Sequence, residues 1–115
     1  MAEIQFSPGI NEPVVPDVRL TRSPDGKSGT ATFLFEQPEI LDPENTTEVT
    51  GMYMVDDEIG QLSTSDVKGI FVNGRATRIK AMYAIKSPEE WDRFMLFMNK
   101  YAEEHGLGLS RSEED

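Results

Sequence analysis

The spacing of hydrophobic and polar positions changes from a period of two to a helical period near the C-terminal end of this chain. Residues 87–106, SPEEWDRFMLFMNKYAEEHG, place apolar side chains three and four positions apart, which predicts an amphipathic helix. Ser87 is a good N-cap, Pro88 suits the first helical position and Gly106 is a natural stop. The apolar stripe predicts either core packing or a methionine-rich partner groove, and its members are Trp91, Phe94, Met95, Met98, Tyr101 and Ala102.

Before the helix, apolar and polar positions alternate, which predicts β-strands. Turn signals at residues 23–26 and at Asn73-Gly74 predict two hairpins, and residues 56–58 read as a solvated turn. Strands followed by one helix indicate an α+β fold, in which a long C-terminal helix packs on a twisted antiparallel β-sheet. The strand candidates are Glu3–Phe6, Asp17–Arg22, Gly29–Glu36, Glu48–Val55, Val67–Val72 and Arg75–Ile85.

The length of 115 residues suits one domain, which we place at residues 1–109, with a disordered acidic tail at 110–115. A formal net charge of -10 argues against a nucleic-acid partner, because such binding depends on neutralising phosphates. The absence of cysteine excludes disulfides, thiolate catalysis and cysteine-ligated metals. No apolar run is long enough to cross a bilayer, and the first residues have no signal-peptide character.

Charge is segregated along the chain. Residues 36–66 contain acidic but no basic residues, whereas residues 67–86 contain basic but no acidic ones. The pattern fits pairing between neighbouring strands plus solvated loops, or a bipolar surface that orients the protein on a charged partner or an anionic membrane face. Arg78 and Lys80 are the candidate docking residues, because the alternation directs both away from the apolar side of their strand.

Methionine is the second candidate feature, with six in the chain. Met52 and Met54 share one strand face, and Met82 lies on the basic face of another strand. Adaptable thioethers suit an irregular core or a protein-binding surface, so all three are candidate partner-binding residues.

No constellation of residues favours catalysis, a cofactor or a metal site. His105 is the only histidine, and a single histidine at a helix end is typically structural or solvated. Metalloprotease, EF-hand and phosphate-loop motifs are absent from the sequence. We therefore expect a protein that is not an enzyme, while a small-ligand-binding or enzymatic α+β domain is the alternative. A buried polar pocket with shifted titratable groups would favour that alternative.

Three segments together resemble one family: VVPDVRLTR at residues 14–22, EVTGMYMVD at 48–56, and SPEEWDRFM at 87–95 with YAEEHG at 101–106. The chain is similar to the photosystem II proteins numbered twenty-eight in the Psb series, also called the thirteen-kilodalton or reaction-centre W proteins. The resemblance covers about residues 2–109, nearly the whole chain.

The resemblance implies a photosystem II assembly factor that joins assembly intermediates transiently. It implies a peripheral position on the thylakoid membrane, on the cytoplasmic side or, in a plastid, the stromal side. The implied partners are the inner chlorophyll-binding antenna subunit and the reaction-centre core subunits. No chlorophyll or other cofactor is implied, and we expect the free protein to be a monomer. Sheet extension, in which a partner segment adds a strand at an open edge, is the expected binding mode.

Overall fold

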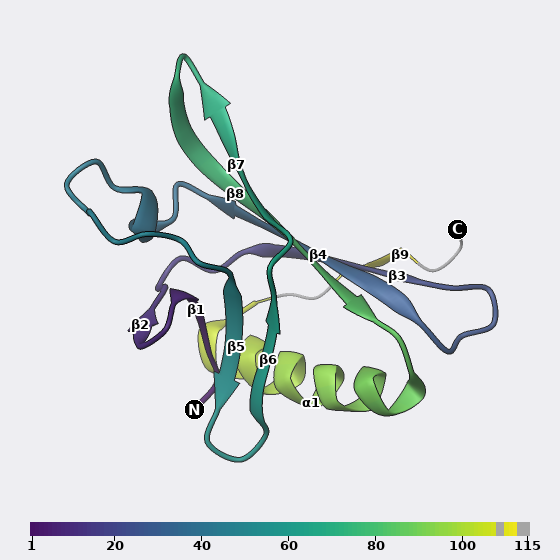
Figure 1. Cartoon of the computed structure of the whole chain (residues 1–115). Helices are drawn as coiled ribbons and strands as arrows, with labels where there is room; N and C mark the ends of the chain where they lie inside the picture. The colour runs from purple at the N-terminus through teal and green to yellow at the C-terminus, as the bar shows by residue number, and fades with distance from the viewer. Residues whose placement is uncertain (108–109, 113–115) are drawn as a thin grey trace.

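The computed structural model describes residues 1–107 and 110–112, which form two β-sheets and one α-helix (Figure 1). One sheet has four strands in the order β2-β1-β5-β6, and the other has five in the order β7-β8-β4-β3-β9. The α+β class is confirmed. The elements are β1 Glu3–Ser7, β2 Ile10–Asn11, β3 Asp17–Arg22, β4 Gly29–Glu36, the 3₁₀ turn η1 Glu39–Leu41, β5 Met52–Asp56, β6 Gly60–Thr64, β7 Val67–Val72, β8 Arg75–Ile85, α1 Pro88–His105 and β9 Ser110–Ser112.

The predicted single sheet is divided in two, because β5 does not join β3, β4 and β8. It pairs instead with β1 on one side, where Ile4 faces Met54, and with β6 on the other, where Met54 faces Leu62. The side chains that alternate inward from β1 and β5 are buried, so this small sheet contributes one whole face to the core. The sequence did not predict β2, which has only two residues, or β6, whose one large apolar side chain is Leu62.

The five-stranded sheet has one buried and one solvent-facing side. Along β8, the side chains of Ile79, Ala81 and Tyr83 are buried, while Lys80 and Met82 between them are exposed. In Figure 1, α1 and the small sheet lie on the same side of this sheet. The two predicted hairpins, β3–β4 and β7–β8, are confirmed by their antiparallel pairing.

Helix α1 begins and ends where the sequence predicts. The side chain of Ser87 accepts a hydrogen bond from the Glu90 backbone N–H, and Gly106 adopts the left-handed conformation typical of a helix stop. Trp91 is only 9% exposed. The buried face comprises Trp91, Phe94, Phe97, Met98 and Tyr101, so Phe97 was missed, whereas Met95 and Ala102 lie at its half-buried rim.

The C-terminal segment differs from the expected disordered tail at residues 110–112. There β9 pairs in parallel with β3, with Arg19 opposite Ser110. The remaining tail residues, 113–115, lie outside the described residues.

Candidate docking surface on the β7–β8 arm

A two-stranded arm projects from the body of the molecule (Figure 1). We define the arm as residues 67–80, which comprise β7, the turn and the first part of β8. The turn is tight because Asn73 and Gly74 both have positive φ, at 55° and 79°, which matches the twist of a two-residue hairpin. A shift in register between Ile70 and Phe71 adds a bulge near the tip.

The outer edge of β7 is the longest strand edge available for pairing. The strands at the ends of the two sheets are β2, β6, β7 and β9, with two, five, six and three residues. Among the described strands, β7 pairs only with β8. Its outer row of backbone groups is therefore a template for another strand.

Gly69 presents its backbone groups along this outer edge. The Met82 N–H donates to the Asp66 carbonyl at 3.0 Å, so even-numbered residues of β8 direct their backbone groups toward β7. The odd-numbered ones face β4, as the 2.8 Å hydrogen bond from the Gln37 N–H to the Thr77 carbonyl shows. Since Gly69 stands opposite Ile79, its own N–H and C=O point away from β8.

The solvent-facing side of the arm is basic, as the sequence predicts for Arg78 and Lys80. Lys80 stands directly opposite Lys68 on β7, a cross-strand arrangement of like charges that opposes folding. Arg78 stands opposite Ile70 and lies 3.8 Å from the Glu36 carboxylate on β4. Pairing with the acidic segment therefore occurs at Arg78, whereas the two facing lysines concentrate positive charge.

The candidate methionines separate into two groups. Met52 and Met54 have no exposed surface and pack in the core, so they are core residues and do not form part of a docking surface. The period-two pattern could not reveal this, because both faces of β5 carry apolar side chains. Met82 is 36% exposed and lies on the same face as Lys80, which keeps it a candidate contact.

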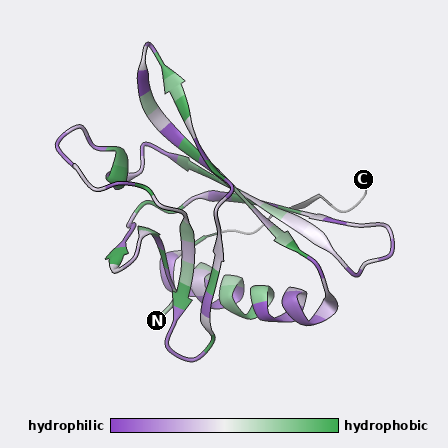
Figure 2. Ribbon diagram, in the orientation of Figure 1, coloured by the Kyte–Doolittle hydropathy of each residue, from purple (hydrophilic) through white to green (hydrophobic). Residues whose placement is uncertain are grey.

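The tip of the arm carries exposed apolar side chains that the sequence analysis did not select. Phe71 is 66% exposed and Val72 is 47% exposed. Figure 2 shows the end of β7 in green, beside purple segments of β8. The sequence did carry a signal for them, the apolar triplet at residues 70–72 immediately before the Asn73-Gly74 turn. A strand that is buried on one face alternates apolar and polar residues, so three consecutive apolar residues leave at least one on the exposed face.

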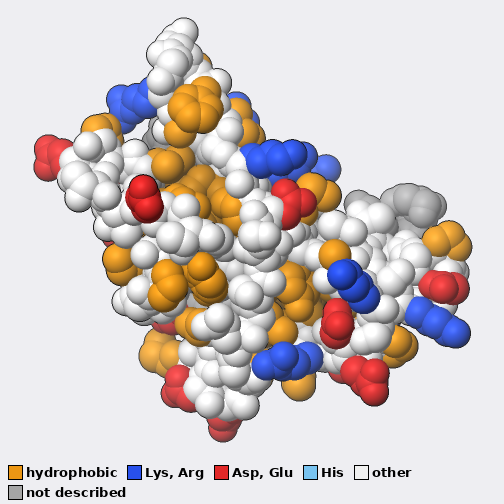
Figure 3. Space-filling view, viewed as in Figure 1, with side chains coloured by type: hydrophobic (Ala, Val, Ile, Leu, Met, Phe, Trp, Pro, Cys, Tyr) orange, Lys and Arg blue, Asp and Glu red, His pale blue; other side chains and the backbone are white. Residues whose placement is uncertain are grey.

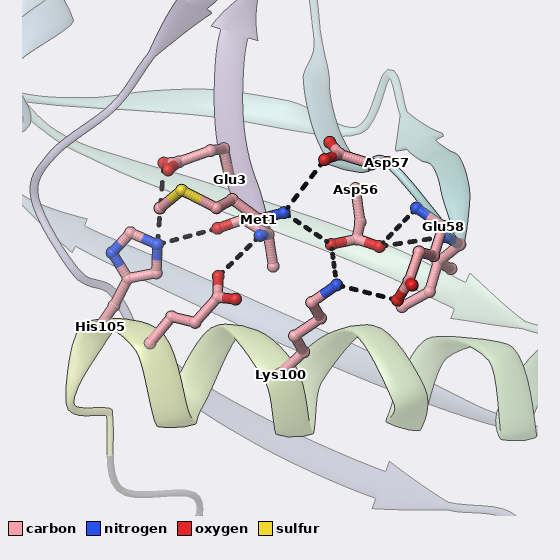
Figure 4. Close-up of polar contacts among 10 residues, drawn as sticks. Met1, Glu3, Asp56, Asp57, Glu58, Lys100 and His105 are labelled. Carbon is pink, nitrogen blue, oxygen red and sulfur yellow. Dashed lines mark hydrogen bonds and ion pairs between the residues drawn. The ribbon is translucent and has the colours of Figure 1, made fainter.

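A separate polar cluster joins the β5–β6 turn to α1 (Figure 4). The prediction of a solvated turn is wrong for Asp56, whose side chain is buried and lies 2.8 Å from the Lys100 ammonium. The backbone N–H groups of Glu58 and Ile59 donate to its other oxygen. The adjacent ammonium holds the pKa of Asp56 well below its usual range, although burial opposes that shift.

His105 has a structural role at the end of α1. Its ring stacks on Tyr101, with centroids 4.3 Å apart, and its Nε2 lies 2.8 Å from the Ala2 carbonyl oxygen. The Ala2 N–H donates to the Glu104 carboxylate at 2.7 Å. These contacts fasten the first strand to the last turn of the helix, as Figure 4 shows for His105.

The shifted titratable groups of this polar cluster have structural partners. Asp56 and Lys100 have shifted pKa values, but each is engaged by the other and by the turn, which is a structural arrangement. Residues 1–107 and 110–112 hold no group of three side chains spaced to bind a metal ion. Within the same residues, the helix is too polar to cross a membrane.

Comparison with known protein families identifies relatives of this chain. A family model described as Psb28 protein matches residues 4–109. The chain belongs to the Psb28 family. A Psb28 relative from Rippkaea orientalis, named as a photosystem II reaction center protein, is 61% identical over 112 residues, covering 97% of each chain. Another, from Nostoc punctiforme, is 56% identical over 114 residues, covering 99% of this chain and all of the relative.

One Psb28 relative carries a more specific name. The protein of Thermosynechococcus vestitus is called a photosystem II assembly factor, and it is 58% identical over 113 residues. The match covers 98% of this chain and 96% of the relative. The resemblance drawn from the three sequence segments is therefore confirmed at the level of the family.

Proposed function

We propose that this chain is a non-catalytic photosystem II assembly factor. It binds partly assembled complexes at the thylakoid surface and leaves when they mature. Membership of the Psb28 family supports this proposal, as does the name of the Thermosynechococcus vestitus relative. The proposed partners are the inner chlorophyll-binding antenna subunit and the reaction-centre core subunits, reached from the cytoplasmic or stromal side.

The observation that carries the binding mode is the outer edge of β7. Alternate residues of this six-residue projecting strand, Gly69 among them, offer backbone donors and acceptors to an extended partner segment. Such a segment would extend the five-stranded sheet, and its acidic side chains would neutralise the facing pair Lys68 and Lys80. The two facing lysines, which repel each other in the free protein, would thus become favourable in the complex.

Gly69 provides a test that alters one backbone hydrogen bond. Gly69→Pro removes the outward N–H without interrupting the ladder to β8, because this N–H faces away from β8. Gly69→Ala is the matched control, since it keeps the N–H and its added Cβ would meet its nearest neighbours at 3.5 and 3.6 Å. The two variants therefore differ mainly in the donor at the open edge.

The measurement is the distribution of each variant among solubilised photosystem II complexes separated by size. Wild type and Gly69→Ala are expected in assembly intermediates and depleted from mature complexes, while Gly69→Pro remains unbound. Circular dichroism checks that all three are folded. Equal binding of Gly69→Pro and Gly69→Ala would exclude pairing at this edge. Equal abundance of the wild type in mature complexes would refute the transient assembly role itself.

A further inference from the structure

The tip of the arm has apolar side chains on both faces of a two-stranded ribbon. Val72 stands opposite Arg75, on the face that carries Ile70 and the lysines. Phe71, one position along, stands opposite Ala76 and lies on the other face, where its ring would meet a Cβ placed at Gly69. A flat protein surface covers one face of a ribbon, whereas a medium that surrounds the tip covers both.

The cations of the arm begin level with this apolar tip and continue behind it. Arg75 is level with Val72, Arg78 is level with Ile70, and the Lys68–Lys80 pair follows. At roughly 3.3 Å per residue, the apolar section is about 7 Å long and the lysine pair is about 13 Å behind Val72. These lengths match the interface of a bilayer, where apolar groups enter about 5–10 Å and cations remain among the headgroups.

The charge distribution fixes the orientation of such contact. Residues 67–86 have five basic and no acidic side chains, whereas the chain as a whole has a formal net charge of -10. An anionic surface therefore attracts the arm and repels the body. Figure 3 shows orange side chains on the projecting arm with blue side chains beside it, while red side chains lie mainly over the rest of this face.

From this geometry we infer that the arm is a membrane-contact device whose tip enters the interface of a bilayer with anionic headgroups. Phe71 and Val72 supply the apolar contact, and Arg75, Arg78, Lys68 and Lys80 bind headgroup phosphates or sulfonates. The apolar part of this contact uses the tip rather than the strand edge, while Lys68 and Lys80 are shared with the proposed partner segment.

The test is co-sedimentation of the full chain with vesicles of pure phosphatidylcholine or of phosphatidylcholine with phosphatidylglycerol. Wild type is expected to bind the anionic vesicles only, and to release as salt is raised. Phe71→Ser with Val72→Ser is expected to weaken binding roughly tenfold, because most of the inserted apolar surface is lost. Lys68→Glu with Lys80→Glu is expected to abolish it.

Matched controls are available elsewhere on the surface. Leu96→Ser removes a 62% exposed apolar side chain from α1, and Lys27→Glu reverses a charge in the β3–β4 turn. Both are expected to bind anionic vesicles like the wild type. Circular dichroism confirms the fold of every variant.

Two outcomes would overturn the inference. One is a Phe71→Ser, Val72→Ser variant that binds anionic vesicles as tightly as the wild type. The other is a wild type that ignores protein-free vesicles of both compositions but binds native membranes, which would assign the tip to a protein partner. Neither outcome bears on the co-migration with assembly intermediates that tests the proposed function.

Discussion

Gly29→Ala is expected to destabilise the fold through a single added methyl group. Gly29 begins β4 and is paired with Arg22 on one side and Ile85 on the other. A Cβ at this position would lie 2.7 Å from Cζ3 of Trp91 and closer still to the Thr21 carbonyl oxygen. Since φ at Gly29 lies outside the left-handed region, the cost is steric rather than conformational.

The expected loss of stability depends on whether the groups that clash with the added methyl group can move away. The Trp91 ring can tilt, but the Thr21 carbonyl belongs to the β3–β4 ladder and shifts only with the strand. Overpacking typically costs about 1–3 kcal/mol, and contact with backbone places Gly29→Ala at the upper end, near 3 kcal/mol. That is a large fraction of the roughly 5–15 kcal/mol that stabilises a domain.

Gly69→Ala is the control, because it makes the same chemical change in a strand of the same sheet. Its Cβ would meet neighbours at ordinary distances, so stability is expected to stay equal or to rise by roughly 0.5–1 kcal/mol as the unfolded chain loses freedom. Urea unfolding followed by circular dichroism and Trp91 fluorescence measures both variants. If Gly29→Ala is as stable as Gly69→Ala, the predicted clash of the added methyl group with Thr21 and Trp91 is refuted.

Two further predictions concern charge. Because the pKa of Asp56 is lower in the folded than in the unfolded chain, its ion pair with Lys100 contributes stability that is fully present above about pH 4 and declines progressively as the pH falls further. Asp56→Asn is therefore expected to be less stable at pH 7 and to lose less stability on acidification, measured by urea unfolding from pH 7 to 3; parallel pH profiles would contradict this. Arg78→Glu with Lys80→Glu is expected to slow association with assembly intermediates at low salt, to approach wild-type rates at high salt and to leave circular dichroism unchanged. Equal association rates of variant and wild type at low salt would instead indicate that Arg78 and Lys80 form a solvated face, with Arg78 paired with Glu36.

Local signals in the sequence predicted local structure well. The cap at Ser87 and the stop at Gly106 define α1, and Asn73-Gly74 defines the β7–β8 turn. These features depend on residues within a few positions of one another. The alternation in β8 likewise identified its solvent-facing side, including Arg78 and Lys80.

Features that depend on distant contacts were not predictable. The burial of Asp56 depends on Lys100, more than forty positions away, so the acidic turn looked solvated. Met52 and Met54 are buried because β5 joins a second sheet, and a strand pattern does not name its partners. Phe97 was missed because α1 is covered by two sheets rather than one, which widens its buried face.

The contacts that fasten Ala2 to Glu104 and His105 span 102 and 103 positions of the chain. During synthesis at about 5–20 residues per second, the last turn of the helix is completed roughly 5–20 s after Ala2. The contacts that join Ala2 to the end of α1 therefore form only after nearly the whole chain has been translated.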